Sequence, residues 1–432
     1  MRVGLFDCLD KCTMSVEPIV ARRAAEPVSG LPEQQPLSTH ASKTRRSHRK
    51  THEAQDRPPF ECIALLLQGG GALGAYQAGV YQALSEAHLH PDWVAGISIG
   101  AINSALIAGN PPQARVEQLR KFWELITTPP AWGGIGQLGA MAVRGDHARG
   151  LMNQMSAGVA LACGASKFFT PRIPIPWLQP PGSLEATSYY DTAPLRATLE
   201  RLVDFDRINS GETRFSISAV NVSTGNFVSF DNATHTIGPE HVIASGALPP
   251  GFPAIEIEGE FYWDGGLVSN TPLEWVLERE PRQDTLAFQV DLWSARGAFP
   301  RTMAEVATRQ KEIQYSSRTR ISSDRFKYTQ KLRNALSSLL QKLPAELKDS
   351  PELAVLGPLA CRKVYNLVQL IYRAKQYEGD SKDYEFSRLS MEEHWRAGYH
   401  DTVRTLRHPE VLERPSNLEG VLTFDLAQNG RE

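Results

Sequence analysis

Two stretches of sequence decide the fold: Ile63-Ala-Leu-Leu-Leu-Gln-Gly-Gly-Gly-Ala-Leu-Gly74 and Trp93-Val-Ala-Gly-Ile-Ser-Ile-Gly100. The first is an apolar run that ends in three glycines, and a helical pattern follows it at 75–87. The second is a shorter apolar run that ends in a Gly-x-Ser-x-Gly motif, and a helical pattern follows it at 101–108. A strand–loop–helix order that occurs twice in succession is typical of a parallel sheet.

Strand and helix patterns continue to alternate up to about residue 290. A third helical pattern spans 116–126, and further strand candidates lie at 215–220, 226–230, 259–263 and 285–290. Such alternation favours a sheet that helices cover on both faces. We therefore predict a three-layer α/β/α domain with a mostly parallel sheet over residues 59–290, with Ser98 at the carboxyl end of a central strand.

The bulk composition is that of an ordinary globular protein. The chain has 432 residues, of which 41% are hydrophobic and 22% charged, with a formal net charge of −2. Nothing in this balance indicates nucleic-acid binding. The five cysteines are scattered without the spacing of a zinc site, which favours free thiols in a reducing compartment. No apolar run reaches the length of about 18 residues that a transmembrane helix needs, so we expect a cytoplasmic protein, with peripheral contact at a membrane left open.

The N-terminal residues, 1–58, have a composition unlike that of the rest. They hold prolines at positions 18, 27, 32 and 36, many serines, threonines and glutamines, and a cluster of basic residues between positions 43 and 50. Little in this stretch could form a core, so it predicts a disordered tail. An arm attracted to anionic lipid is the alternative function for its basic cluster.

Residues 130–185 form a segment rich in Gly, Ala, Met and Pro, with bulky groups at Trp132, Phe168, Phe169 and Trp177. No charged residue occurs from 151 to 166. The segment is either a lid or wall of an acyl-binding pocket, or an ordinary helical insertion packed on the core.

Beyond residue 291 the pattern becomes mainly helical, and we predict a helical C-terminal extension over 291–432. Residues 302–343 predict one or two long helices, 363–377 predict another, and a capping box at 390–393 opens the last. Basic residues outnumber acidic ones between 302 and 343. Such a face docks on a membrane in some proteins and is simply solvated in others.

The Gly96-x-Ser98-x-Gly100 motif fits a nucleophile elbow. A serine between a strand and a helix lies on a tight turn, and glycines two positions to either side let the backbones approach without clashes. The hydroxyl then projects outward, near a helix N-terminus that favours developing negative charge.

The glycine loop before it has two interpretations. Gly69-x-Gly71-x-x-Gly74 after a strand fits a dinucleotide fingerprint, but the next strand ends in Ser98 and not in the acidic residue that would hold a ribose. No Gly-Lys-Ser/Thr follows, so it is not a phosphate-binding P-loop. As an oxyanion hole, the loop would direct the N–H groups of Gly70 and Gly71 at a tetrahedral intermediate.

A serine nucleophile needs a base. None of the 11 histidines lies in a context that marks it as catalytic. Asp264 is the better candidate, because Gly265 and Gly266 follow it at a strand end and let its carboxylate approach another backbone closely. The alternative is that Asp-Gly-Gly is merely a turn.

Together these motifs resemble the patatin-like phospholipase family, over roughly residues 64–277. The resemblance rests on the glycine loop, the serine elbow, Asp264-Gly-Gly with Asn270 and Pro272 behind it, and the segment 244–253 before the aspartate. It implies a serine–aspartate dyad without histidine: Ser98 as nucleophile and Asp264 as general base. It further implies an oxyanion hole formed by Gly69, Gly70 and Gly71, an acyl-enzyme intermediate, and no metal or cofactor. The substrate it implies is a phospholipid, lysophospholipid or other acyl ester.

The sequence departs from that family at two positions of the glycine loop. Gln68 stands where many members have an acid, and Leu73 where many have Arg or Lys. The second change removes a cation that could meet an anionic head group. The extension after residue 295 resembles that of some bacterial members.

Three other functions compete with this one. The first is an α/β-hydrolase with a Ser-Asp-His triad, built from Asp264 and a late histidine such as His394 or His400. The second is a non-catalytic membrane-docking module with an idle site. The third is a nucleotide-dependent oxidoreductase.

Overall fold

The computed structural model describes residues 49–54, 56–128, 145–344, 347, 350–375, 377–417 and 419–426, with the backbone alone at 317–321. Ser47–Glu432 form one unit. The predicted tail lies almost wholly outside the described residues, as does Trp132 of the predicted insertion.

Nine strands of the described residues form one sheet, in the order β11-β10-β9-β1-β2-β5-β8-β7, with β6 also paired to β5. The strands from β11 to β5 are mutually parallel, while β6, β7 and β8 form antiparallel pairs. Their bounds are β1 Cys62–Leu67, β2 Trp93–Gly96, β5 Arg214–Asn221, β6 Phe227–Asp231, β7 Ile255–Ile257, β8 Glu260–Asp264, β9 Thr285–Asp291, β10 Tyr365–Ile371 and β11 Val421–Phe424. The strands predicted from the sequence are β1, β2, β5, β6, β8 and β9.

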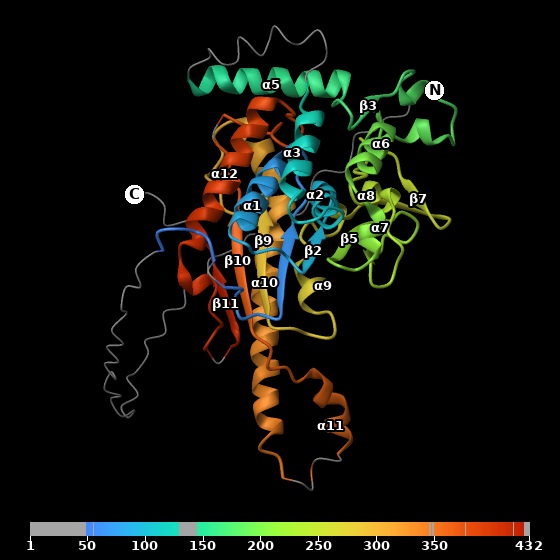
Figure 1. Ribbon diagram of the computed structural model, residues 1–432. Coiled ribbons are helices and arrows are strands. Elements are labelled where there is room, and N and C mark those ends of the chain that lie inside the picture. The colour runs from blue at the N-terminus through green and yellow to red at the C-terminus, as the bar shows by residue number, and fades with distance from the viewer. Residues whose placement is uncertain are drawn as a thin grey trace, which may run out of the picture. The chain divides into compact units, whose positions relative to one another are not determined.

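Alternation along β1 shows why helices cover both faces of the sheet. Ile63, Leu65 and Leu67 point into one core cluster with side chains from the helices at 75–86, 99–108, 115–126 and 388–406. Ala64 and Leu66 point into a second cluster with side chains from the helices at 273–277 and 303–340. Because β1 is buried on both faces, its sequence is a continuous apolar run. The predicted three-layer α/β/α fold is confirmed (Figure 1).

The longer helices follow the sequence pattern closely. The predicted helices at 75–87, 101–108 and 116–126 are α1, α2 and α3, and the long C-terminal helix is continuous as α10. The helix bounds are α1 Ala75–Glu86, α2 Ile99–Ala108, α3 Arg115–Ile126, α5 Asp146–Cys163, α6 Ala193–Leu202, α7 Phe205–Asn209, α8 Pro239–Ser245, α9 Leu273–Leu277, α10 Met303–Leu340, α11 Pro351–Leu356 and α12 Arg388–Leu406.

The C-terminal region differs from its prediction in two details. The predicted helix at 363–377 is wrong, because Tyr365–Ile371 is strand β10, paired in parallel with β9. Its apolar run is buried on both faces, so it lacks the alternation that would have identified a strand. The last helix is capped by Ser387, which accepts a hydrogen bond from the N–H of Ser390, so the helix begins before the predicted capping box. Strands β10 and β11 extend the central sheet beyond β9.

Among the described residues, every helix is too short or too polar to cross a bilayer. A small two-stranded sheet, β3 Thr170–Pro171 with β4 Tyr190–Asp191, stands apart from the main sheet. It closes the base of the segment 172–189.

Candidate active site

Ser98 lies on the turn between β2 and α2. Its backbone has φ 57° and ψ −124°, a conformation that a non-glycine residue rarely adopts. The two glycines of the motif make the turn possible: a Cβ on Gly96 would lie 2.2 Å from the carbonyl oxygen of Gly100, and a Cβ on Gly100 would lie 2.3 Å from that of Leu67. The N–H of Ser98 donates to the carbonyl and the hydroxyl of Ser245, both at 3.1 Å, which holds the elbow in place.

Asp264 reaches Ser98 because of the strand register. Strand β6 occupies one edge of β5, opposite 216–220. On the other edge, β2 ends with Gly96 opposite Ile217, and β8 begins its pairing with Asp264 opposite Ala219. Strands β2 and β8 therefore meet end to end along the same edge. The chain leaves β2 for the serine elbow at the place where β8 delivers its aspartate.

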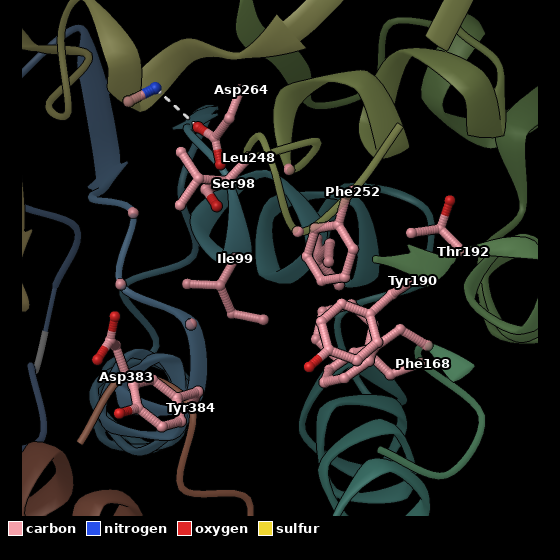
Figure 2. Close-up of a pocket in the computed structure, with 18 of the residues that line it drawn as sticks. Ser98, Ile99, Phe168, Tyr190, Thr192, Leu248, Phe252, Asp264, Asp383 and Tyr384 are labelled. Atoms are coloured by element: carbon pink, nitrogen blue, oxygen red, sulfur yellow. Dashed lines mark hydrogen bonds between the residues drawn. The ribbon is translucent and has the colours of Figure 1, made fainter. Parts of the chain in front are cut away.

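The Asp264 side chain is buried and has few polar neighbours. Its Oδ1 accepts the N–H of Gly266 at 2.7 Å, the hydrogen bond drawn in Figure 2. Burial raises the pKa of Asp264 to about 7, against the lowering effect of hydrogen bonds from the Ser98 side chain and the Gly266 N–H. A carboxyl group with this pKa is ionised in part of the population near neutrality and can still take up a proton.

The glycine loop passes beside Ser98. A Cβ on Gly69 would lie 3.1 Å from the Cβ of Ser98. The Gly69 N–H donates to the carbonyl of Asn270 at 3.4 Å, whereas the N–H groups of Gly70 and Gly71 have no acceptor among the described residues. Gly71 has φ +55°, and a Cβ there would lie 2.1 Å from the carbonyl oxygen of Asp383. Two backbone donors thus remain available beside the serine.

Gln68 holds this loop in position, which sequence reasoning did not anticipate. Its Oε1 accepts the N–H groups of Leu292 and Trp293, at 2.6 and 3.0 Å, and its amide donates to Thr271 and to the Tyr315 carbonyl. An acid at this position could not donate the last two bonds when ionised. Leu73, the other departure from the family pattern, is fully buried in the core.

The Gly69 carbonyl receives two further hydrogen bonds. Asn270 Nδ2 and Trp293 Nε1 both donate to it at 3.0 Å. The position of Asn270 behind the aspartate motif was a sequence signal for this contact, whereas nothing in the sequence indicated Trp293.

The serine and aspartate open onto a cavity of about 300 Å³ with mainly apolar walls. Figure 2 shows Phe252, Tyr190 and Phe168 grouped across it from Ser98. Phe168 and Phe169 lie 5.5 Å apart by ring centroids, and Phe169 is 4.8 Å from Tyr190. Trp177, which the sequence grouped with these phenylalanines, is 82% exposed and does not line the cavity.

The C-terminal region supplies the remaining wall, through Asp383, Tyr384 and Phe386. The Asp383 carbonyl accepts the N–H of Ala72 at 2.8 Å, within the glycine loop. Lys311 of α10 binds both carboxylate oxygens of Asp383, at 2.8 and 3.1 Å, and the carbonyl of Asp380 at 2.9 Å. We call residues 380–386 the strap, because they tie α10 to the glycine loop.

No histidine of the described residues lines the cavity. His394 instead lies 3.5 Å from Glu378 and packs its ring on Tyr372, and His400 packs against Tyr399. The geometry therefore gives no support to a Ser-Asp-His triad. In the described part of the chain, no group of three or more His, Cys, Asp or Glu side chains is arranged to hold a metal ion.

Comparison with known proteins gives matches to two protein families. The family described as patatin-like phospholipase matches residues 65–277, which contain the glycine loop, the serine and the aspartate, and a second family, described as patatin phospholipase, matches residues 313–418. Patatin-like phospholipase domain-containing protein 6 of Homo sapiens is 44% identical over 61 residues, and protein 7 of Rattus norvegicus is 41% identical over 61 residues. These stretches cover 14% of this chain and 4% of either relative.

Two solved structures are similar at low identity. VipD from Legionella pneumophila is 15% identical, with 90% of this chain and 77% of that chain covered and a TM-score of 0.36. The type III effector protein ExoU is 18% identical, with 71% and 70% covered and a TM-score of 0.22. On the two family matches, the chain belongs to the patatin-like phospholipase family.

Proposed function

We propose that this protein is a serine lipid acyl hydrolase, with Ser98 as nucleophile and Asp264 as its general base. The observation that carries the proposal is the hydroxyl of Ser98, on its strained turn, beside a buried carboxyl group with a pKa of about 7, at the opening of an apolar cavity. Neither residue would need this placement for the stability of the sheet alone.

Acylation follows from the positions of these groups. An acyl ester places its chain in the cavity and its carbonyl carbon against Ser98 Oγ. As Oγ attacks, Asp264 takes the hydroxyl proton, and the N–H groups of Gly70 and Gly71 stabilise the negative charge that develops on the carbonyl oxygen. The C–O bond of the alcohol then breaks, Asp264 returns the proton to the leaving alkoxide, and the acyl group stays on Ser98.

Deacylation repeats the same steps with water. Asp264 removes a proton from the water that attacks the acyl-serine, and the same two N–H groups stabilise the second tetrahedral intermediate. When the intermediate collapses, the proton returns to Ser98 Oγ and the fatty acid leaves. Because a single carboxyl group serves as base and then acid twice, a pKa close to the working pH suits the cycle.

The aromatic side of the cavity favours a lipid as substrate. Phe168, Phe169, Tyr190, Phe252 and Phe386 offer apolar surface at the place where an acyl chain bound to Ser98 would extend. The substrate class is therefore a phospholipid, lysophospholipid or other acyl ester, met at the surface of a membrane or micelle. Short-chain carboxylesters, which need less of the cavity, serve as convenient test substrates.

Hydrolysis of p-nitrophenyl esters from C4 to C16 tests the proposal in wild type, Ser98→Ala and Asp264→Asn. We expect turnover by wild type and loss of at least about a thousandfold in each variant. A fluorophosphonate probe should label wild type and leave Ser98→Ala unlabelled. His394→Ala should keep its activity, since His394 lies outside the cavity.

Other outcomes would favour the competing functions. An active Ser98→Ala protein would place the chemistry elsewhere. A wild type that neither hydrolyses the esters, with or without lipid micelles, nor reacts with the probe would support a non-catalytic docking module. Loss of activity in His394→Ala, with its fold intact, would support the Ser-Asp-His triad.

A further inference from the structure

Beyond its first turn, helix α5 has an outward face without charge. Its buried side chains include Asn153, Ala157 and Ala160, which direct the opposite face away from the protein. That face carries Leu151, Gln154, Met155, Gly158, Leu161 and Ala162. Met155 is 65% exposed. A helix on a protein surface ordinarily presents charged and polar residues to water, so this composition calls for a partner.

The segment 173–184 also exposes apolar side chains without charge, although it is not an α-helix. It reads Ile-Pro-Ile-Pro-Trp-Leu-Gln-Pro-Pro-Gly-Ser-Leu, without a charged residue. Ile173 is 89% exposed, Trp177 82% and Leu178 73%, and Ile175 and Leu184 are also exposed. In Figure 1, α5 and the green segment beyond β3 lie at the same end of the molecule. We call α5 and residues 173–184 together the apolar rim.

Tyr190 connects both parts of the apolar rim to the cavity. Its hydroxyl donates to the carbonyl of Leu161 at 2.8 Å, and Leu161 is both exposed and part of the cavity lining. Its N–H donates to the carbonyl of Gly251, another lining residue, at 2.9 Å. Strand β4, which contains Tyr190, also pairs with β3 at the base of segment 172–189. The exposed face of α5 therefore reaches the wall of the cavity at Leu161, and segment 173–184 lies between the two strands of the pair that contains Tyr190.

We propose that the apolar rim is the surface by which this protein docks on lipid bilayers and micelles. The proposal rests on the proposed lipid hydrolase function, because the cavity that it surrounds is the one assigned to the acyl chain. A rim inserted among lipid tails removes its large apolar side chains from water. An acyl chain then moves from the lipid into the aromatic cavity without crossing water. Trp177 suits the boundary between head groups and tails, where tryptophan is favoured.

Helix α10 offers a matched control. It also exposes large apolar side chains, among them Tyr328 and Leu332. These lie between charged residues such as Lys327 and Lys331, and they do not line the cavity. If any exposed apolar side chain or basic helix face were sufficient for docking, substitutions on α10 and on the rim would have similar effects.

Vesicle sedimentation with phosphatidylcholine measures docking directly. The Ser98→Ala protein, which leaves the lipid intact, is compared with the same protein carrying Ile173→Ser and Trp177→Ser, or Tyr328→Ser and Leu332→Ser. We expect the rim pair to lower vesicle binding by at least about tenfold, and the α10 pair to leave it unchanged. With Ser98 intact, the rim pair should lose hydrolysis of vesicle lipid and keep hydrolysis of soluble p-nitrophenyl butyrate.

Three outcomes would overturn the docking proposal. The rim substitutions could leave vesicle binding unchanged, the rim and α10 substitutions could reduce binding equally, or the Ser98→Ala parent protein could fail to bind vesicles. Binding that requires phosphatidylglycerol and disappears in high salt, with the rim pair without effect, would assign docking to basic residues. If no variant hydrolyses any ester, the hydrolase function fails, but the sedimentation result still decides whether the rim docks. Circular dichroism and thermal unfolding then confirm that each variant is folded.

Discussion

The two sides of the cavity are built on different physical principles. On the reactive side, Ser98, Asp264 and the glycine loop lie at strand ends. The backbone there is fixed by hydrogen bonds that Gln68 and the strap accept and that Trp293 donates. On the opposite side, aromatic rings pack at centroid distances of about 5–6 Å without any comparable polar network.

Because of this difference, substitutions on the two sides should change activity in different ways. On the reactive side, an error of about 1 Å in a donor is expected to be costly, because the charge of the transition state is stabilised only at one place. On the aromatic side, the free energy of binding an acyl chain scales with the apolar area that is buried, so each ring contributes part of it. Substitutions should therefore act sharply on one side and gradually on the other.

Of these substitutions, Gly71→Ala should reduce activity most, because it displaces the glycine loop on the reactive side. Its methyl group would meet the Asp383 carbonyl at 2.1 Å in a backbone conformation that alanine disfavours, so the loop must move. We expect a loss of about 10²–10³ in kcat for the C4 ester. Gly158→Ala is the matched control, because a Cβ there meets nothing within 4 Å, and it should behave as wild type. An active Gly71→Ala enzyme would contradict the positional argument.

The pH dependence should come next in size. Burial raises the pKa of Asp264 to about 7, and the reaction needs the ionised carboxylate, so kcat/KM should rise with pH and level off above 7. Below that value it should fall by about tenfold per pH unit. Asp291 has its pKa raised to about 7 as well, by burial. Asp291→Asn should leave the pH profile of kcat/KM unchanged. If the profile shifts in this variant, Asp291 and not Asp264 controls it, and the prediction is wrong.

The strap should have a smaller, graded effect. Lys311→Met leaves Asp383 without its cation, so the carbonyl that holds the Ala72 N–H becomes less well fixed. We expect about a tenfold loss in kcat with little change in KM for the C4 ester, and partial recovery in Lys311→Arg. Lys331→Met, which removes an exposed ion pair with Glu419, is the control. Equal loss in both variants would show a general effect of charge on α10.

Local sequence rules predicted two parts of the reactive side, the glycine loop and the serine elbow. A glycine loop after one strand and a serine between glycines after the next predict where both lie along parallel strands. That Asp264 would lie beside Ser98 could not be read from spacing, because 166 positions separate them and the strand register brings them together. The family resemblance, and not the residues alone, supplied that pairing.

The parts that the sequence missed depend on contacts between distant segments. Strand β10 was mistaken for a helix, because a short run buried on both faces has no diagnostic period. The roles of Gln68 and the strap required partners more than 200 residues away in the chain. Trp177 was grouped with the cavity phenylalanines because composition alone does not separate a buried aromatic residue from an exposed one.

The smallest effect we expect is on chain-length preference, and it tests the aromatic side. Phe168→Leu removes part of a ring that lies across the cavity from Ser98 (Figure 2). A C4 chain is too short to need that surface, whereas a C12 or C16 chain would lose about 1 kcal/mol of contact there, or about fivefold in kcat/KM. Phe299→Ala, at a strongly exposed position, should change neither rate. The decisive quantity is the ratio of the C16 to the C4 rate. A fall in this ratio supports an additive acyl-binding wall, whereas equal loss on both esters would mean that the rings position the reactive side and that the two sides of the cavity are not independent.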